Sequence, residues 1–126
     1  MSLEEDKQNK AEFLHFFEVV WSGRLPGDEE WMGEILTAFP DLKATPDRVL
    51  AAEGGHVVIM FTVTATHQGD YRGVPATGEP ITFKGITVAQ MENGKIVDEF
   101  FVATKMGAVM FGVTSWLEEV GWRPQN

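Results

Sequence analysis

The sequence predicts an α+β fold in which two helices precede a four-stranded antiparallel sheet. In the first third of the chain, apolar residues recur every three or four positions, which is the spacing of one helical face. From about residue 42, β-branched and aromatic runs bounded by turn residues replace this pattern and are typical of strands. Helices first and strands after them are the order of an α+β domain.

The first helix is expected over residues 3–22. Ser2 is a candidate N-cap because Glu5 stands three positions later, and Gly23 and Pro26 end the helical pattern. The apolar residues that share one face of this helix are Phe13, Phe16, Phe17 and Val20.

A second helix is expected over about residues 27–39. Asp28 is its candidate cap, and Pro40 stops it because proline disfavours helical backbone in the residue before it. The apolar side of this helix is formed by Trp31, Ile35, Leu36 and Phe39.

The predicted strands span residues 42–53, 56–68, 80–92 and 95–106. Two glycines separate the first pair, and Asn93-Gly94 favours a type I′ hairpin turn between the last two strands. The stretch from Gln68 to Glu79 is a glycine-rich loop, and loops of this length are often functional. Residues 107–121 form either a short helix or the end of the last strand followed by a turn.

Length and composition exclude several classes of function. The chain has 126 residues, 44% of them hydrophobic, which fits one globular domain over residues 1–126. The absence of cysteine rules out a disulfide framework, a thiolate nucleophile and a cysteine-ligated zinc site. A net charge of −9 makes nucleic acid and anionic membrane surfaces poor partners. No apolar run could span a bilayer and the first residues are unlike a secretory signal, so we expect a cytoplasmic protein.

Four segments are similar to one protein family. Residues 9–25 (NKAEFLHFFEVVWSGRL) resemble its opening helix, and AFPDL at residues 38–42 resembles its entry into the sheet. THQGDYRGVPATGEPITFKGI at residues 66–86 is close to its long-loop motif, and ENGKIVDEF at residues 92–100 is close to its last hairpin. On these segments the chain resembles the SnoaL-like polyketide cyclase family, within the nuclear-transport-factor-2-like superfamily.

The resemblance implies a cone-shaped, strongly curved antiparallel sheet packed around the N-terminal helices, with a pocket inside the cone. Members of the family are commonly dimers. Family enzymes such as the anthracycline ring cyclases close a ring by an intramolecular aldol reaction without metal or cofactor. For this chain the resemblance therefore implies a small-molecule ligand, a homodimer and no cofactor.

Two departures from the family qualify this expectation. Family members usually have a further helix and a strand after the first helix, whereas here residues 22–28 lead almost directly to the second helix, which shortens the N-terminal half. An alternative alignment places residues 11–21 on the family's first strand, but the helical spacing of the phenylalanines favours a helix. The cyclases' acidic residue corresponds to Thr104, whose hydroxyl does not titrate near neutral pH.

One pocket wall is expected on the second strand, because side chains alternate between the two faces of a strand. Phe61, Ala65 and His67 share one of these faces. A neutral imidazole at His67 could act as a base or orient a carbonyl group. In the alternative interpretation, which we prefer, His67 hydrogen-bonds the loop backbone and holds the shape of the loop.

The last strand supplies the second expected wall, with Phe100 and Thr104 on one face. His67 and Thr104 are thus the candidate catalytic residues. Further candidate substrate contacts are Gln90, for which an exposed strand end is the simpler interpretation, and Tyr71, which either closes over the pocket or is an exposed loop aromatic. Trp21 is expected first to pack in the core and second to line the pocket.

Two functions from different classes follow from these patterns. The chain is either a cyclase- or isomerase-type enzyme that acts on a small, mostly apolar carbonyl compound by cofactor-independent acid/base chemistry, or a non-catalytic small-molecule-binding or dimeric accessory module of the same fold. The three histidines show no metal-ligand spacing, so no metal site is expected. Dimerisation is expected through the outer face of the sheet, with Met60, Thr62 and Thr64 as candidate contacts.

Overall fold

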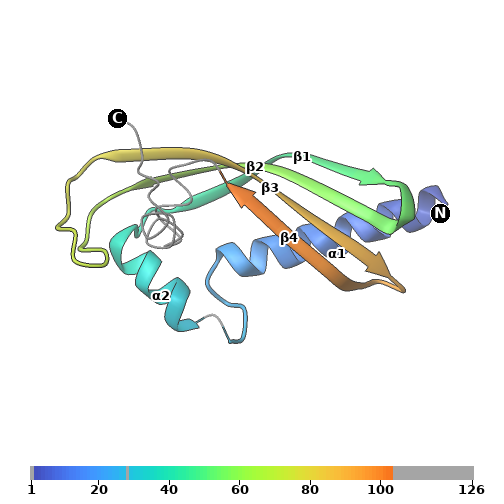
Figure 1. Ribbon diagram of the computed structural model, residues 1–126, viewed down its shortest axis with the longest axis horizontal. Helices are drawn as coiled ribbons and strands as arrows, with labels where there is room; N and C mark the ends of the chain where they lie inside the picture. Colours follow the sequence, from blue (N-terminus) through green and yellow to red (C-terminus); the bar gives the residue numbers. More distant parts are fainter. Residues whose placement is uncertain (1, 28, 104–126) are drawn as a thin grey trace, which may run out of the picture.

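The computed structural model describes residues 2–27 and 29–103, and it confirms the α+β fold class. Thr104, the candidate cap Asp28 and the segment 107–121 lie outside the described residues. The helices and strands follow one another in the predicted order, with boundaries close to those expected (Figure 1). The elements are α1 (Leu3–Trp21), α2 (Glu29–Ala38), β1 (Lys43–Ala52), the 3-10 turn η1 (Glu53–Gly55), β2 (His56–Thr66), β3 (Pro80–Glu92) and β4 (Lys95–Ala103).

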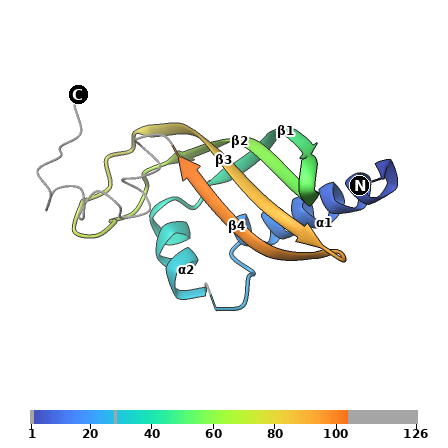
Figure 2. The same ribbon diagram turned by 45° about the vertical axis from the view of Figure 1, so that its right-hand side comes forward.

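The four strands form one antiparallel sheet in the order β1-β2-β3-β4. Figures 1 and 2 show a twisted, curved sheet with both helices on the same side of it and β4 crossing in front of α1. Because both helices lie on one side, the sheet has an inner face, which the helices cover, and an outer face, which they do not cover. This is the arrangement expected for a cone-shaped sheet around helices.

Local sequence signals explain the position of α1. The Ser2 hydroxyl accepts a hydrogen bond from the Glu5 backbone N–H at 3.1 Å, so Ser2 is the N-cap as predicted. The first turn holds three acidic residues, whose negative charges stabilise the helix by interacting with the positive end of its dipole. The reading of residues 11–21 as a strand is therefore excluded.

Among the described residues, no helix is long and apolar enough to cross a membrane.

The connection between the two helices is short, as the sequence indicated. The backbone N–H groups of Gly23 and Arg24 donate to carbonyl groups of the last turn of α1, and Gly23 has a positive φ of 77°. This left-handed conformation turns the chain away from the helix axis and is readily adopted by glycine. The described part of residues 22–28 holds neither helix nor strand, so the chain passes directly from α1 to α2.

Alternation along β2 and β3 separates the two faces of the sheet. On β2 the odd-numbered residues from Val57 to Ala65 are buried, and their even-numbered neighbours are more exposed. The inner face packs against apolar side chains of both helices. The largest fully buried side chains are Phe13, Met32, Ile35, Val57, Ile59, Phe61 and Val63. Burying each of them contributes about 1.5–3 kcal/mol relative to leaving it in water.

The strand pairing of the sheet is shifted at two places. The pairing of β1 with β2 shifts between Pro46 and Arg48, and the pairing of β3 with β4 shifts between Gln90 and Met91. The β3–β4 hairpin turns at Asn93 and Gly94, whose φ angles of 51° and 75° match the predicted type I′ turn. The second shift sets which residues of β4 face inward.

The long loop between β2 and β3 is anchored to the end of α2. The backbone N–H groups of Gln68 and Gly69 both donate to the Ala38 carbonyl oxygen, at 2.9 and 3.0 Å. Asp41 holds the end of β2, because its carboxylate accepts hydrogen bonds from the backbone N–H and the hydroxyl of Thr66. These bonds lower the pKa of Asp41, since they favour the charged form.

Candidate functional site

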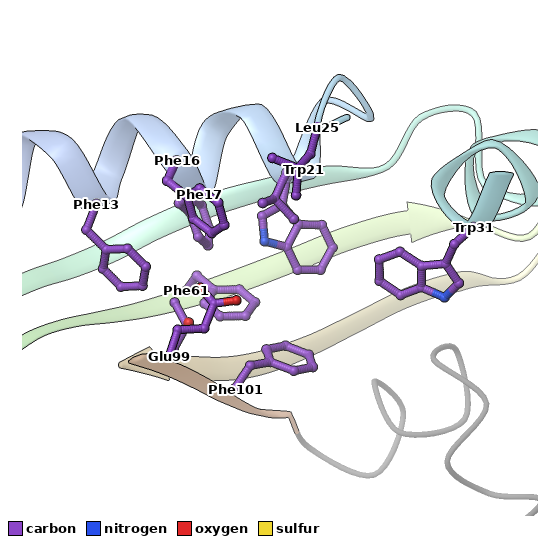
Figure 3. A pocket seen from close by; sticks show the side chains of 11 residues that line it. Phe13, Phe16, Phe17, Trp21, Leu25, Trp31, Phe61, Glu99 and Phe101 are labelled. Carbon is purple, nitrogen blue, oxygen red and sulfur yellow. The ribbon is translucent and has the colours of Figure 1, made fainter. Parts of the chain in front are cut away.

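An aromatic cavity lies between α1 and the inner face of the sheet. It has a volume of about 190 Å³, which exceeds the ~150 Å³ of an apolar cavity known to take up benzene. Figure 3 shows Phe13 of α1 and Trp31 of α2 toward opposite ends of the cavity, with Trp21 between them and with Phe61 and Phe101 on the side of the sheet. The described lining residues are Phe13, Phe16, Phe17, Val20, Trp21, Leu25, Trp31, Phe61, Thr87, Glu99 and Phe101.

Phe61 is the central ring of this lining. Its ring meets Phe17 edge-on at a centroid distance of 5.1 Å, lies 5.5 Å from Trp21 and stacks on Phe101 at 6.2 Å. Gly85, the cross-strand partner of Phe61, makes room for it, because a Cβ atom there would lie 2.4 Å from the tip of the ring. The packing of Phe61 therefore depends on a glycine in the neighbouring strand.

Glu99 brings a carboxylate to the cavity from β4. It pairs with Ala89 of the inner face of β3, and its side chain rises from β4 toward α1 (Figure 3). Thr87 also lines the cavity, but its hydroxyl donates to the backbone carbonyl of Phe100 at 3.2 Å. Among the described lining residues, Glu99 is the single side chain that can carry charge.

The predicted face of β4 is wrong by one residue. Phe100 pairs with Val88 on the outer face and is 57% exposed, whereas its neighbour Phe101 lines the cavity. Gln90, whose cross-strand partner is Asp98, is also on the outer face and does not line the cavity. The physical reason is the register shift beside Gln90, because moving the register by one residue turns every following side chain to the other face.

The remaining predicted residues divide between the cavity and its surroundings. Phe61 and Trp21 both line the cavity. Ala65 is buried on the inner face of β2 but does not line it. Thr104, the position of the family acid, lies outside the described residues.

His67 is built into the long loop and does not line the cavity. Its side chain is only 7% exposed, its ring stacks on Phe39 at 5.3 Å, and its Nδ1 lies 3.2 Å from the Thr77 hydroxyl. Its backbone N–H donates to Glu79 and its carbonyl accepts from Gly78, which ties the two ends of the loop together. This geometry supports the interpretation in which His67 holds the shape of the loop.

Tyr71 is neither an exposed loop aromatic nor a lid on the cavity. It is buried, and its ring packs edge-on against Phe39 at 5.6 Å. Arg72 covers it at 5.5 Å and also bonds to Glu34 of α2 at 3.2 Å. Burial raises the pKa of the Tyr71 phenol above its usual range, while the charge of Arg72 opposes this shift.

Sequence reasoning missed most of the aromatic lining and the acidic residue. Phe13, Phe16 and Phe17 were expected only to pack, since helical spacing does not distinguish a core contact from a cavity wall. Glu99 and Phe101 have the same strand parity, so assigning the second aromatic of the Phe100-Phe101 pair inward would have found both. In the described part of the chain, no three His, Asp or Glu side chains gather in a way that could hold a metal ion.

These features define a class of protein: an α+β fold with a curved antiparallel sheet around helices and an aromatic pocket on its inner face. The model of the SnoaL-like polyketide cyclase family matches residues 17–109, which is most of the chain. The chain therefore belongs to the SnoaL-like polyketide cyclase family, as the sequence motifs indicated.

Solved structures share this fold. AclR from Streptomyces galilaeus, described as a candidate hydroxylase, is 25% identical with a TM-score of 0.67, and the match covers 86% of this chain and 98% of AclR. A candidate SnoaL-like polyketide cyclase from Jannaschia sp. CCS1 is 18% identical with a TM-score of 0.66, covering 91% of this chain and 97% of that chain. A candidate polyketide cyclase from Acidithiobacillus ferrooxidans is 24% identical with a TM-score of 0.63, and the match covers 94% of this chain and 99% of that chain. These last two likenesses concern the fold alone. Among proteins with curated descriptions, none matches this chain.

Proposed function

We propose that the chain binds a small, mostly apolar carbonyl compound in the aromatic cavity. The observation that carries this proposal is the lining itself, in which seven aromatic rings surround about 190 Å³ of space. Ligand sites are typically concave and apolar with a few polar groups that fix orientation, and here Glu99 and Thr87 are the polar members of the described lining. The carbonyl group is inferred from the family, whose description names polyketide cyclases.

A second candidate function is cofactor-independent acid/base catalysis on the same compound. Glu99 favours it, because a carboxylate next to a bound carbonyl compound can remove a proton from the carbon beside the carbonyl. His67 does not line the cavity and Thr104 is outside the described residues, so Glu99 takes the place of both in this proposal. If this proton transfer does not occur, the protein is a non-catalytic module that only binds the compound.

One experiment with acetophenone tests binding and catalysis together. Calorimetry should show saturable binding with a Kd on the order of 1 mM, as for a small apolar ligand. Val20→Phe, which adds a ring to the cavity lining, should abolish binding, whereas Val19→Phe at the next position of α1 should bind as the wild type does. Binding that persists unchanged in Val20→Phe would place the ligand elsewhere and contradict the proposal.

The same ligand in D2O separates an enzyme from a binding module. If Glu99 removes a methyl proton of bound acetophenone and the enolate then takes a deuteron, proton NMR will show exchange faster than in buffer. Glu99→Gln should lose this acceleration and keep binding, while Glu92→Gln, at the exposed end of β3, should keep both. Wild-type protein that binds without accelerating exchange is a binding module toward this carbonyl compound.

We also propose that two copies of the chain associate through the outer face of the sheet. An apolar row, Leu50, Val58, Val88 and Phe100, crosses all four strands, and Met60, Ile86 and Val102 form a second row beside it. Phe100 and Val102 are more than half exposed, and such apolar patches mark interaction surfaces. Of the dimer contacts expected from the sequence, Met60 belongs to these rows, and Thr62 lies beside it on the same face.

Light scattering after gel filtration tests this association. The wild type should elute with twice the chain mass of 14.0 kDa. Val102→Lys should give the mass of one chain, because a lysine that is buried in the interface without a partner costs more than a small interface returns. Val74→Lys is the matched control, since Val74 is 52% exposed against 59% for Val102 but lies on the long loop. A wild-type monomer at micromolar concentration would contradict the proposal.

A further inference from the structure

The aromatic cavity has a ring at each end. Figure 3 shows Phe13 of α1 toward one end and Trp31 of α2 toward the other, with Trp21 between them. Phe13 is 1% exposed and belongs to the buried core, and Trp31 is half-buried and packs against that core. The length available to a ligand that lies along α1 is therefore limited by these two end rings.

The width of the cavity is limited by rings that already contact one another. The centroid of the Phe61 ring lies 5.1 Å from that of Phe17 and 5.5 Å from that of Trp21, which are the distances of direct aromatic pairs. Phe101 stacks on Phe61 from the side of β4. A ligand ring therefore lies beside these pairs and not between them, because a wider ligand would have to separate packed side chains.

The volume of the cavity sets the size of the ligand that it can enclose. An apolar cavity of about 150 Å³ takes up benzene, which is about 25 Å³ for each carbon atom. By the same ratio, the volume of about 190 Å³ found here accepts about eight non-hydrogen atoms. One six-membered ring with a short substituent has this size. Sites for drug-sized ligands have about 300–1,000 Å³, so a compound of several fused rings cannot be enclosed.

The exposed members of the described lining lie on one side. They are Glu99 and Phe101, both on β4, whereas the other described lining residues are buried or half-buried. Part of a larger ligand could therefore leave the cavity only on the β4 side. Because hydrophobic stabilisation grows with the apolar area that is buried, a second ring held outside adds little to the affinity.

We propose that the cavity selects a monocyclic carbonyl compound, whose single ring lies among Trp21, Trp31 and Phe61, and that it does not enclose a second fused ring. Of the two end rings, Phe13 belongs to the buried core, so Trp31 is the residue that determines this specificity. The inference rests on the proposed ligand-binding function and names the size class of the ligand.

Acetophenone and 2-acetylnaphthalene test the inference, because they carry the same carbonyl group and differ by one fused ring. Each is titrated into the intact protein while NMR follows the indole N–H signals of Trp21 and Trp31, which line the cavity. Enclosing the second ring would strengthen binding on the order of 100-fold. We expect 2-acetylnaphthalene to bind at most about fivefold more tightly than acetophenone, because its second ring stays outside.

Trp31→Ala opens one end of the cavity. In this variant, followed by the Trp21 signal, the preference for 2-acetylnaphthalene over acetophenone should rise at least about tenfold, because the second ring can then be buried. Leu25→Ala is a second enlarged variant that leaves α2 unchanged, and it should raise the preference about threefold or more. Leu36→Ala is its matched control, since Leu36 is also half-buried but does not line the cavity, and it should keep the wild-type preference.

The outcomes separate the size limit from the pocket itself. Wild-type protein that prefers 2-acetylnaphthalene by more than about fivefold would overturn the size limit and leave the ligand-binding function intact. If neither ketone perturbs either indole signal, the proposed ligand-binding function is wrong. A preference that stays at the wild-type value in both Trp31→Ala and Leu25→Ala, or that rises equally in Leu36→Ala, would overturn the assignment of the limit to the cavity walls.

Discussion

Replacement of Phe61 by alanine is expected to lower the free energy of unfolding by about 3–5 kcal/mol, the usual cost of removing a buried phenylalanine ring. Phe61 is 1% exposed, and its ring contacts those of Phe17, Trp21 and Phe101. The substitution also uncovers Gly85, which has no side chain to fill the space. In thermal unfolding this loss corresponds to a fall in Tm of about 10–25 °C for a domain of this size.

Phe61→Leu is the control for this prediction. Leucine keeps most of the apolar volume, so we expect a loss of only about 1–1.5 kcal/mol in urea unfolding, with an unchanged m-value. If alanine and leucine at residue 61 were equally destabilising, or if alanine cost under about 1 kcal/mol, Phe61 would not be the centre of the aromatic packing.

Gly69→Ala is expected to release the long loop from the end of α2. A Cβ atom on Gly69 would lie 2.6 Å from the Thr37 carbonyl oxygen and 3.2 Å from the Ala38 Cα, both of which are backbone atoms. The methyl group therefore cannot be accommodated by rotating a side chain, and the loop must move. We expect a loss of about 2–4 kcal/mol, from overpacking and from weakening the two hydrogen bonds to the Ala38 carbonyl oxygen.

Tyr71 reports this release directly, because it is the single tyrosine of the chain and burial raises its pKa. In Gly69→Ala its ionisation, followed by ultraviolet absorbance, should begin at a lower pH than in the wild type, since an exposed phenol titrates near 10. Gly33→Ala is the matched control, because a Cβ atom there meets nothing within 4 Å. It should leave the titration unchanged and, in a helix, stabilise by up to about 1 kcal/mol. An unchanged Tyr71 titration in Gly69→Ala would show that the methyl group fits.

Much of the fold is visible in the sequence because it depends on local signals. Ser2 caps α1, Gly23 ends it, and Asn93-Gly94 turns the last hairpin, each through contacts within a few residues. The family motifs identified the same fold independently. For the candidate site, Phe61 and Trp21 line the cavity. The inner face of β2 follows from periodicity alone, whereas Trp21 was expected first to pack in the core.

The sequence by itself determined the α+β class, the order of the elements and the family, because these depend on local propensity and on the period of apolar residues. Only the tertiary structure decided which side of β4 faces the cavity. The adjacent pair Phe100-Phe101 satisfies alternation in either register, and the register shift beside Gln90 places Phe101 and Glu99 inside and Phe100 outside. The charge of the proposed ligand site thus depends on pairing between strands, which alternation within one strand cannot specify.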